Sequence, residues 1–125
     1  MKRYIRSSSG YPYPYKQSPE YARLADYGYT LEVNKRPTQR GGRGLDYNEY
    51  TNACVIKFPD GDIYASFTFL EPTDPDLLDE FSIEHGMNHW DVYADGERIN
   101  DRIDYEPYTF DECVVCALRY FWSYY

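Results

Sequence analysis

The sequence has few of the residues that usually fill a hydrophobic core. Val, Ile, Leu and Phe together number 24 of 125 residues, close to the level at which chains become disordered. Sixteen tyrosines offset this shortage, because a tyrosine ring can be buried while its hydroxyl stays near water or a hydrogen-bond partner. The length predicts one domain. Since tyrosine is enriched where proteins bind each other, a tyrosine-rich surface also suits protein recognition.

Long apolar runs are also missing. No segment approaches the roughly 18 consecutive apolar residues that a membrane span needs. Residues 7–10 (SSSG) stand where a signal peptide would have its apolar stretch. We therefore expect a cytoplasmic protein without a membrane segment. In that compartment, paired cysteines are more often reduced, metal-binding or catalytic than disulfide-linked.

Charge is distributed unevenly along the chain. Residues 1–44 carry nine Lys and Arg against three Asp and Glu, a charge of +6, whereas residues 45–125 carry four against eighteen, a charge of −14. An acidic body repels nucleic-acid phosphates and attracts basic surfaces, including those of proteins that hold nucleic acid. The same charge also keeps a protein soluble, so both interpretations stay open.

The N-terminal third predicts an arm, a helix, a strand and a loop. Residues 1–17 have Tyr and Pro interleaved among basic residues, which favours an extended arm, and the domain proper is expected at 18–125. Such an arm also has the composition that stacks on nucleic acid. Ser18, Pro19 and Glu20 are typical of a helix start, and Gly28 of its end. Residues 29–33 alternate as a strand, and the glycine-rich, basic residues 35–44 predict a mobile loop.

The clearest local structure is a β-hairpin. Residues 53–58 and 63–70 are strand-like and flank residues 59–62 (PDGD), a turn sequence. We expect Phe58 opposite Ile63, which sets the register of the two strands. The predicted core face then consists of Cys54, Ile56, Phe58, Ile63, Ala65, Phe67 and Phe69.

The remaining patterns complete an α+β fold. A helix is expected from residue 74 or 75 to a stop at Gly86, followed by a strand at 89–93 and a tight turn at Asp95 and Gly96. Thr109 and Glu112 form a capping box for a mostly buried C-terminal helix. The order predicts a small antiparallel sheet of roughly three to five strands with helices packed on it.

Both histidines and two of the three cysteines fall between residues 85 and 116. His85 and His89 form an H-x3-H pair, and Cys113 and Cys116 form a C-x2-C pair, spacings that zinc sites use. Near a helix N-terminus, the dipole favours the thiolate that binds metal. Four protein ligands would make the zinc structural. In the alternative interpretation, the cysteines pack in the core and His85 caps a helix.

Motifs for catalysis are weak. The histidine pair lacks the Glu of H-E-x-x-H, and residues 35–44 do not match a phosphate-binding loop. Neither Cys113 nor a histidine stands in a recognisable nucleophile motif. We therefore expect a protein without enzymatic activity.

The whole-chain profile resembles the type II-A anti-CRISPR proteins, small inhibitors carried by phages and mobile elements that block Cas9. The shared features are the short single domain, the MKRYIRSSSG opening without a targeting signal, and the acidic, tyrosine-rich body. Those proteins have no common fold or motif, so no functional residue carries over. The resemblance implies a non-catalytic inhibitor of a basic, nucleic-acid-handling protein such as Cas9.

We hold two hypotheses about the binding surface. In the first, acidic residues on the outer face of the middle helix bind the basic partner, helped by exposed tyrosines. These residues are Asp74, Asp76, Asp79, Glu80 and Glu84. In the second, the chain is a zinc-stabilised regulator that binds nucleic acid through Arg36, Arg40 and Arg43 of its basic N-terminal third.

Overall fold

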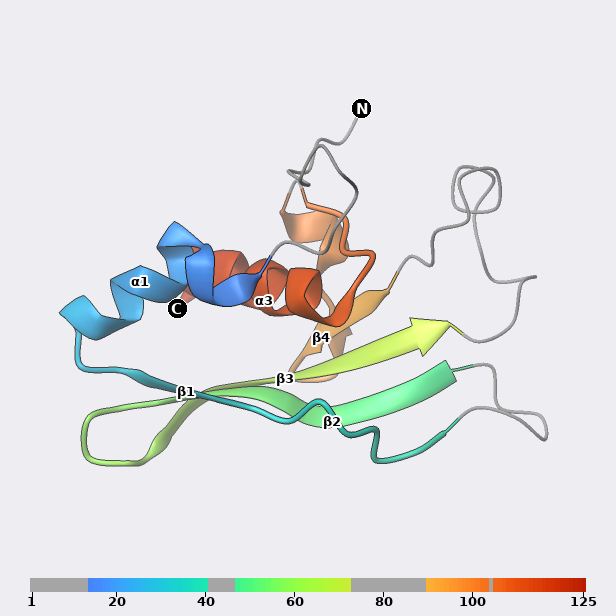
Figure 1. Ribbon diagram of the computed structural model, residues 1–125, viewed down its shortest axis with the longest axis horizontal. Helices are drawn as coiled ribbons and strands as arrows, with labels where there is room; N and C mark the ends of the chain where they lie inside the picture. The colour runs from blue at the N-terminus through green and yellow to red at the C-terminus, as the bar shows by residue number, and fades with distance from the viewer. Residues whose placement is uncertain (1–13, 41–46, 73–89, 104) are drawn as a thin grey trace.

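The computed structural model describes residues 14–40, 47–72, 90–103 and 105–125. Within these ranges the strands form one five-stranded antiparallel sheet in the order β1-β2-β3-β4-β5, and the helices lie on one face of it (Figure 1). The strands are β1 (Thr30–Val33), β2 (Tyr47–Lys57), β3 (Ile63–Pro72), β4 (Asp91–Ala94) and β5 (Glu97–Arg98). The predicted α+β class is confirmed.

The first helix, α1 (Pro19–Asp26), begins as the sequence predicts. The Ser18 hydroxyl accepts a hydrogen bond from the Tyr21 amide at 3.2 Å, and proline occupies the first position. Gly28 follows the helix with φ +71°, a left-handed conformation that favours glycine. In the described part of the chain, no helix is long and apolar enough to cross a membrane.

The structure describes only residues 14–17 of the predicted N-terminal arm. Here the chain forms a 3₁₀ helix, η1 (Tyr15–Gln17), rather than extended backbone. Tyr15 packs against the core and meets Tyr21 edge-on, with ring centroids 5.5 Å apart. These residues therefore belong to the packed domain. Residues 1–13 of the arm lie outside the described residues.

The β2–β3 hairpin confirms most of the predicted register. Cys54 pairs with Phe67 and Ile56 with Ala65, and all four are buried. The predicted pairing of Phe58 with Ile63 is wrong, because Ile63 pairs with Lys57 instead.

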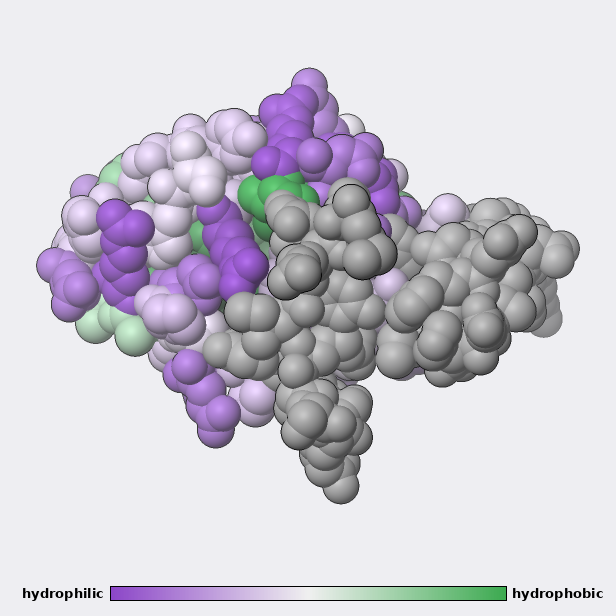
Figure 2. All heavy atoms as spheres, turned by 90° about the horizontal axis from the view of Figure 1, so that it is seen from above, coloured by the Kyte–Doolittle hydropathy of each residue, from purple (hydrophilic) through white to green (hydrophobic). Residues whose placement is uncertain are grey.

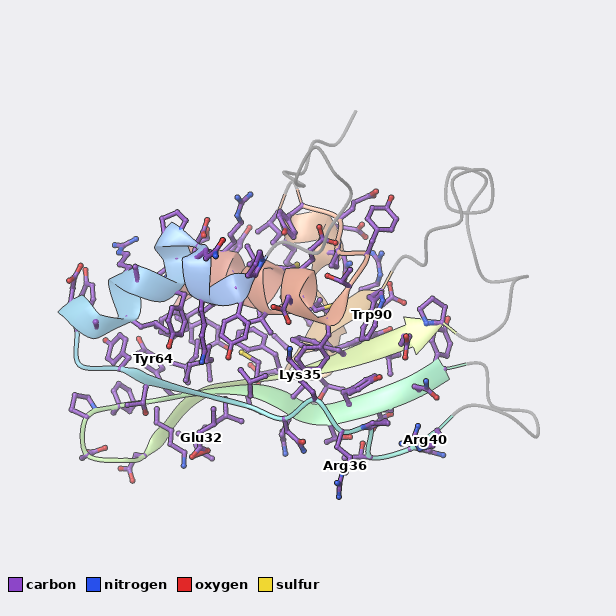
Figure 3. All side chains as sticks on the ribbon, viewed as in Figure 1. Glu32, Lys35, Arg36, Arg40, Tyr64 and Trp90 are labelled. Atoms are coloured by element: carbon purple, nitrogen blue, oxygen red, sulfur yellow. The ribbon has the colours of Figure 1, made fainter. Side chains whose placement is uncertain are left out.

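The cause of this difference is an extra residue, Tyr64, in β3. Such a bulge reverses the alternation of inward and outward side chains beyond it. Tyr64 therefore turns toward the helices, where its ring stacks 4.2 Å from that of Phe58 (Figure 3). Ile63, predicted to lie in the core, is exposed.

The basic segment after β1 follows the edge of β2. The Asn34 amide donates to the Ala53 carbonyl at 2.9 Å, and the Thr38 amide donates to the Glu49 carbonyl at 2.7 Å. Gln39 forms an isolated bridge with Glu49. The predicted mobile loop is thus hydrogen-bonded to the sheet over residues 38 and 39. Residues 41–44 lie outside the described residues.

The C-terminal helix, α3 (Phe110–Tyr124), is buried as predicted. Thr109 caps it by accepting a hydrogen bond from the Glu112 amide at 3.2 Å. In a capping box, the Glu112 carboxylate would accept a hydrogen bond from the amide of the cap residue, Thr109. Here it accepts from the preceding amide, that of Tyr108, at 2.9 Å. Its buried side chains after Glu112 are Cys113, Val114, Val115, Cys116, Ala117, Leu118, Tyr120 and Phe121.

A buried asparagine joins β4 to the short 3₁₀ helix η3 (Asn100–Arg102). The Asn100 side chain accepts a hydrogen bond from the Val92 amide at 2.8 Å and donates to the Trp90 carbonyl at 3.0 Å. Between β4 and β5, Asp95 and Gly96 have φ of 53° and 81°, so the predicted tight turn is confirmed. The predicted helix at residues 74–86 lies outside the described residues.

Candidate functional site

The two cysteines of the predicted zinc site lie in the core. Burial raises the pKa of the Cys113 thiol well above its ordinary value, and the neighbouring Cys116 raises this pKa further. The neutral thiol is therefore favoured, whereas a metal needs the thiolate. Among the described residues, no three His, Cys, Asp or Glu side chains form a group that could hold a metal ion. His85 and His89 lie outside these residues, so the four-ligand site stays a prediction.

Metal analysis of purified protein tests the zinc hypothesis directly. The hypothesis predicts about one zinc per chain and a lower melting temperature after chelation, since a structural metal adds its binding free energy to folding. A metal-free protein whose melting temperature is unchanged by chelator would leave Cys113 and Cys116 as core side chains.

The third cysteine, Cys54, is equally inaccessible. It is fully buried on β2, and burial raises the pKa of its thiol. Nucleophilic catalysis needs an accessible cysteine with a lowered pKa. All three cysteines are buried and none forms a disulfide. Burial raises the pKa of Cys54 and of Cys113, so both favour the neutral thiol.

The predicted partner-binding acids are outside the described residues. Asp74, Asp76, Asp79, Glu80 and Glu84 all belong to the segment 73–89. Their role therefore stays a prediction, and a candidate surface has to be built from the rest of the chain.

Exposed large apolar side chains gather at one end of the domain. Those found in the described residues are Tyr27 (49% exposed), Ile63 (64%), Tyr124 (55%) and Tyr125 (41%). Tyr27 caps α1, Ile63 opens β3 at the hairpin turn, and the two other tyrosines end the chain. These three segments lie at the same end of the ribbon (Figure 1). Within this end, the Tyr124 ring stacks on Tyr120 at 4.6 Å and its hydroxyl donates to the Arg102 carbonyl. We call the end of the domain that bears these four residues the aromatic end.

A layer of more deeply packed rings supports the aromatic end. Tyr27 stacks on Tyr29 with centroids 5.4 Å apart, and Tyr29 meets Tyr64 edge-on at 5.5 Å. Tyr64 contacts Tyr125 at 5.8 Å, and Tyr125 stacks on the buried Phe121 at 5.4 Å. Because each exposed ring rests on a fixed neighbour, little conformational entropy is lost when a partner covers it.

Carboxylates adjoin three of the four residues of the aromatic end, while Arg23 lies 5.8 Å over the Tyr27 ring. Asp26 precedes Tyr27, and Asp60 and Asp62 stand at the hairpin turn before Ile63. Asp95 accepts a hydrogen bond from the Tyr125 hydroxyl at 3.4 Å. None of the four aspartates forms a salt bridge with another described residue, since the ion pairs seen there involve other acids. Their uncompensated charge favours a basic partner.

The outer face of the sheet, away from the helices, has a hollow of about 500 Å³ next to Asp95. Its lining residues are Glu49, Asn52, Ser66, Thr68, Leu70, Tyr93, Asp95 and Gly96. Burial, and to a lesser extent Asp91, raises the pKa of Tyr93, so its hydroxyl stays protonated at neutral pH. The Tyr93 ring and the carboxylates of Glu49 and Asp95 line the same hollow, a combination that suits binding of a lysine or arginine side chain.

The described bases of the N-terminal third do not share one face. Lys35 lies on the helix side, where its amine pairs with Asp111 at 2.9 Å, whereas Arg36 points to the opposite side of the sheet (Figure 3). A nucleic-acid groove needs bases that converge on one backbone path. Of the predicted set Arg36, Arg40 and Arg43, the structure describes only the first two, and both are exposed.

The sequence predicts exposed tyrosines, but it does not show which residues form the aromatic end. Its residues come from three distant segments. The alternation predicts Ile63 in the core, because the bulge at Tyr64 leaves no signal in the sequence. The terminal pair Tyr124 and Tyr125 could have been found, since both follow the last apolar position of the helical pattern.

Known proteins give no guide to the function of this chain. No family model matches the sequence, and no curated protein or solved structure is significantly similar to the chain.

Proposed function

We propose that the protein is a non-catalytic inhibitor that binds a basic, nucleic-acid-handling protein of the Cas9 type, in the manner of type II-A anti-CRISPR proteins. The observation that carries this proposal is the aromatic end, where preorganised tyrosines stand among uncompensated aspartates. Tyrosine supplies large contact area at low entropic cost, which is why it is frequent among the residues that dominate interfaces.

The mode of inhibition follows from charge. Cas9-type proteins hold their guide-target duplex in a positively charged channel. A domain of net charge −8 is attracted to such a channel and competes there with nucleic acid. The aspartates beside the aromatic end pair with Lys and Arg of the partner, while the rings provide the desolvated contact. The predicted contacts of the partner with Asp74, Asp76, Asp79, Glu80 and Glu84 remain part of this proposal.

Variants of two exposed tyrosines test the surface. We expect Tyr27→Ala and Tyr124→Ala each to weaken binding to a Cas9-type nuclease by about tenfold or more, because truncating a central interface tyrosine removes both contact area and desolvation. Calorimetry or surface-based kinetics on purified proteins measures this change.

The matched control at the same position is Tyr27→Phe, which keeps the ring and removes only the hydroxyl. Its affinity should stay close to that of the unaltered chain. Melting temperatures of all variants show that the fold is retained, as expected for side chains about half exposed. Unchanged affinity of both alanine variants would remove the aromatic end from the interface.

The alternative function is a nucleic-acid-binding regulator, which makes the opposite prediction. It requires the isolated chain to bind DNA or RNA at ordinary salt and to lose that binding when Arg36, Arg40 and Arg43 are neutralised. The inhibitor proposal requires the chain itself to leave free nucleic acid unbound.

A further inference from the structure

A second concave surface lies on the helix-bearing side of the domain and is lined by arginines. It is a groove of about 540 Å³ between α1, η3 and α3. Its lining residues are Pro19, Glu20, Arg23, Arg102, Ile103, Arg119, Trp122 and Ser123. Figure 2 views this side of the molecule, where strongly hydrophilic side chains lie close to apolar ones.

The groove is rich in arginine although the chain as a whole is acidic. Three guanidinium groups and one carboxylate line it, so its formal charge is 3 − 1 = +2. Glu20 pairs with the Arg119 Nε at 3.0 Å and thereby balances one arginine. Arg23 has no carboxylate partner among the described residues and stacks 4.3 Å over the Trp122 ring. Arg102 pairs with Glu97, which lies outside the groove lining.

Contacts with neighbouring elements hold the lining side chains in place. The Trp122 indole donates a hydrogen bond to the Glu20 carbonyl at 2.9 Å, which fixes the last turns of α3 against the first turn of α1. Arg119 lies 4.7 Å over the buried Tyr105 ring. The Tyr124 hydroxyl donates to the Arg102 carbonyl at 3.1 Å and thus ties η3 to α3. The groove is therefore largely preformed.

The walls combine charge with apolar surface. Ile103 and Trp122 are partly buried and belong to the hydrophobic side chains packed against the core. Pro19 adds a third apolar wall beside the guanidinium groups. Arginine forks match the geometry of phosphate oxygens, and apolar walls accommodate an organic body. The volume falls within the roughly 300–1,000 Å³ of small-molecule sites.

We propose that this groove binds the phosphate group of a small organic phosphate. The lining residues together carry a formal charge of +2, opposite in sign to a phosphate monoester, which carries a charge of about −1.5 to −2 at neutral pH. Arg23 has no carboxylate partner among the described residues, whereas Arg102 shares its guanidinium between Glu97 and the phosphate. Arg23 and Arg102 contact the phosphate oxygens, and the organic body lies against Ile103 and Trp122. This site adjoins the aromatic end, because Tyr27 contacts Trp122 with ring centroids 5.2 Å apart, but it uses different side chains to bind its ligand.

Titration of the full chain with adenosine 5′-monophosphate tests the site, with adenosine as the uncharged comparison. Followed by ¹H–¹⁵N NMR, the nucleotide should cause saturable shifts of the Trp122 indole and of amides in α1 and α3, whereas adenosine should cause none. Arg23→Gln and Arg102→Gln should each weaken binding by about tenfold, since each removes a charge-assisted hydrogen bond.

Arg36→Gln is the matched control, because Arg36 is an exposed arginine on the opposite side of the sheet (Figure 3). Its affinity for the nucleotide should equal that of the unaltered chain. Absence of saturable shifts at millimolar nucleotide, equal shifts with adenosine, or equal losses in all three variants would overturn the proposal. The dispersion of the NMR spectrum reports in the same experiment that each variant is folded.

Discussion

Replacing Phe67 by alanine is expected to lower the free energy of unfolding by about 3–5 kcal/mol. Phe67 is almost completely buried in the middle of β3, opposite Cys54, and meets the Tyr120 ring of α3 edge-on at 6.2 Å. Truncation removes this sheet-to-helix contact and leaves a cavity. Because domains of this size are stable by only about 5–15 kcal/mol, the loss is a large share of the total. Urea denaturation followed by circular dichroism measures it.

The control for this variant is the next residue on the same strand. Thr68 lines the outer face of the sheet, so Thr68→Ala should cost about 1 kcal/mol or less. Equal losses for the two variants would mean that the inward and outward faces of β3 are assigned wrongly.

Asn100→Ala is expected to cost about 2–5 kcal/mol. The side chain is fully buried and bonds both to the Val92 amide and to the Trp90 carbonyl. Alanine leaves a buried donor and a buried acceptor without this partner, and each loss costs about 1–3 kcal/mol. Thermal or urea unfolding measures the change, and hydrogen exchange at the Val92 amide should become faster.

Asp101→Ala is the neighbouring control for this variant. Asp101 is exposed and pairs with Arg98 at the surface, an interaction worth at most about 1 kcal/mol. A cost for Asn100→Ala no larger than that for Asp101→Ala would show that the buried bridge does not hold η3 to β4.

The parts of the fold that the sequence predicted are those set by short-range chemistry. A serine followed by proline starts α1, and the Thr109 hydroxyl starts α3, because each cap satisfies amides within the next three residues. The alternation that predicts Cys54 opposite Phe67 likewise needs only two adjacent strands. Such signals are complete within a short window of sequence.

The misplaced Ile63 has a different origin. Whether β3 gains an extra residue at Tyr64 depends on the energy of burying that tyrosine against Tyr29 and Phe121, which belong to other elements. A tyrosine suits either a core or a surface margin, so its identity does not decide the matter. Positions beyond a bulge therefore cannot be assigned from alternation alone.

The candidate surfaces required tertiary information for the same reason. The aromatic end unites side chains from α1, β3 and the end of α3, and the arginine-lined groove unites α1, η3 and α3. The C-x2-C spacing of Cys113 and Cys116, by contrast, is visible in the sequence. The burial that raises the pKa of Cys113 is not, because it depends on which elements pack around the helix. Spacing alone does not distinguish two cysteines that bind a metal from two cysteines that pack in the core.

Target-DNA cleavage by a Cas9-type nuclease, titrated with the full chain, tests the inhibitor proposal most directly. We expect cleavage to fall to background at equimolar amounts of the chain and to return when salt is added, because exposed charge pairs are screened. Cleavage that persists in an excess of the chain would show that the chain does not inhibit the nuclease. Binding of the chain to free DNA that disappears when Arg36, Arg40 and Arg43 are neutralised would instead support the nucleic-acid-binding regulator.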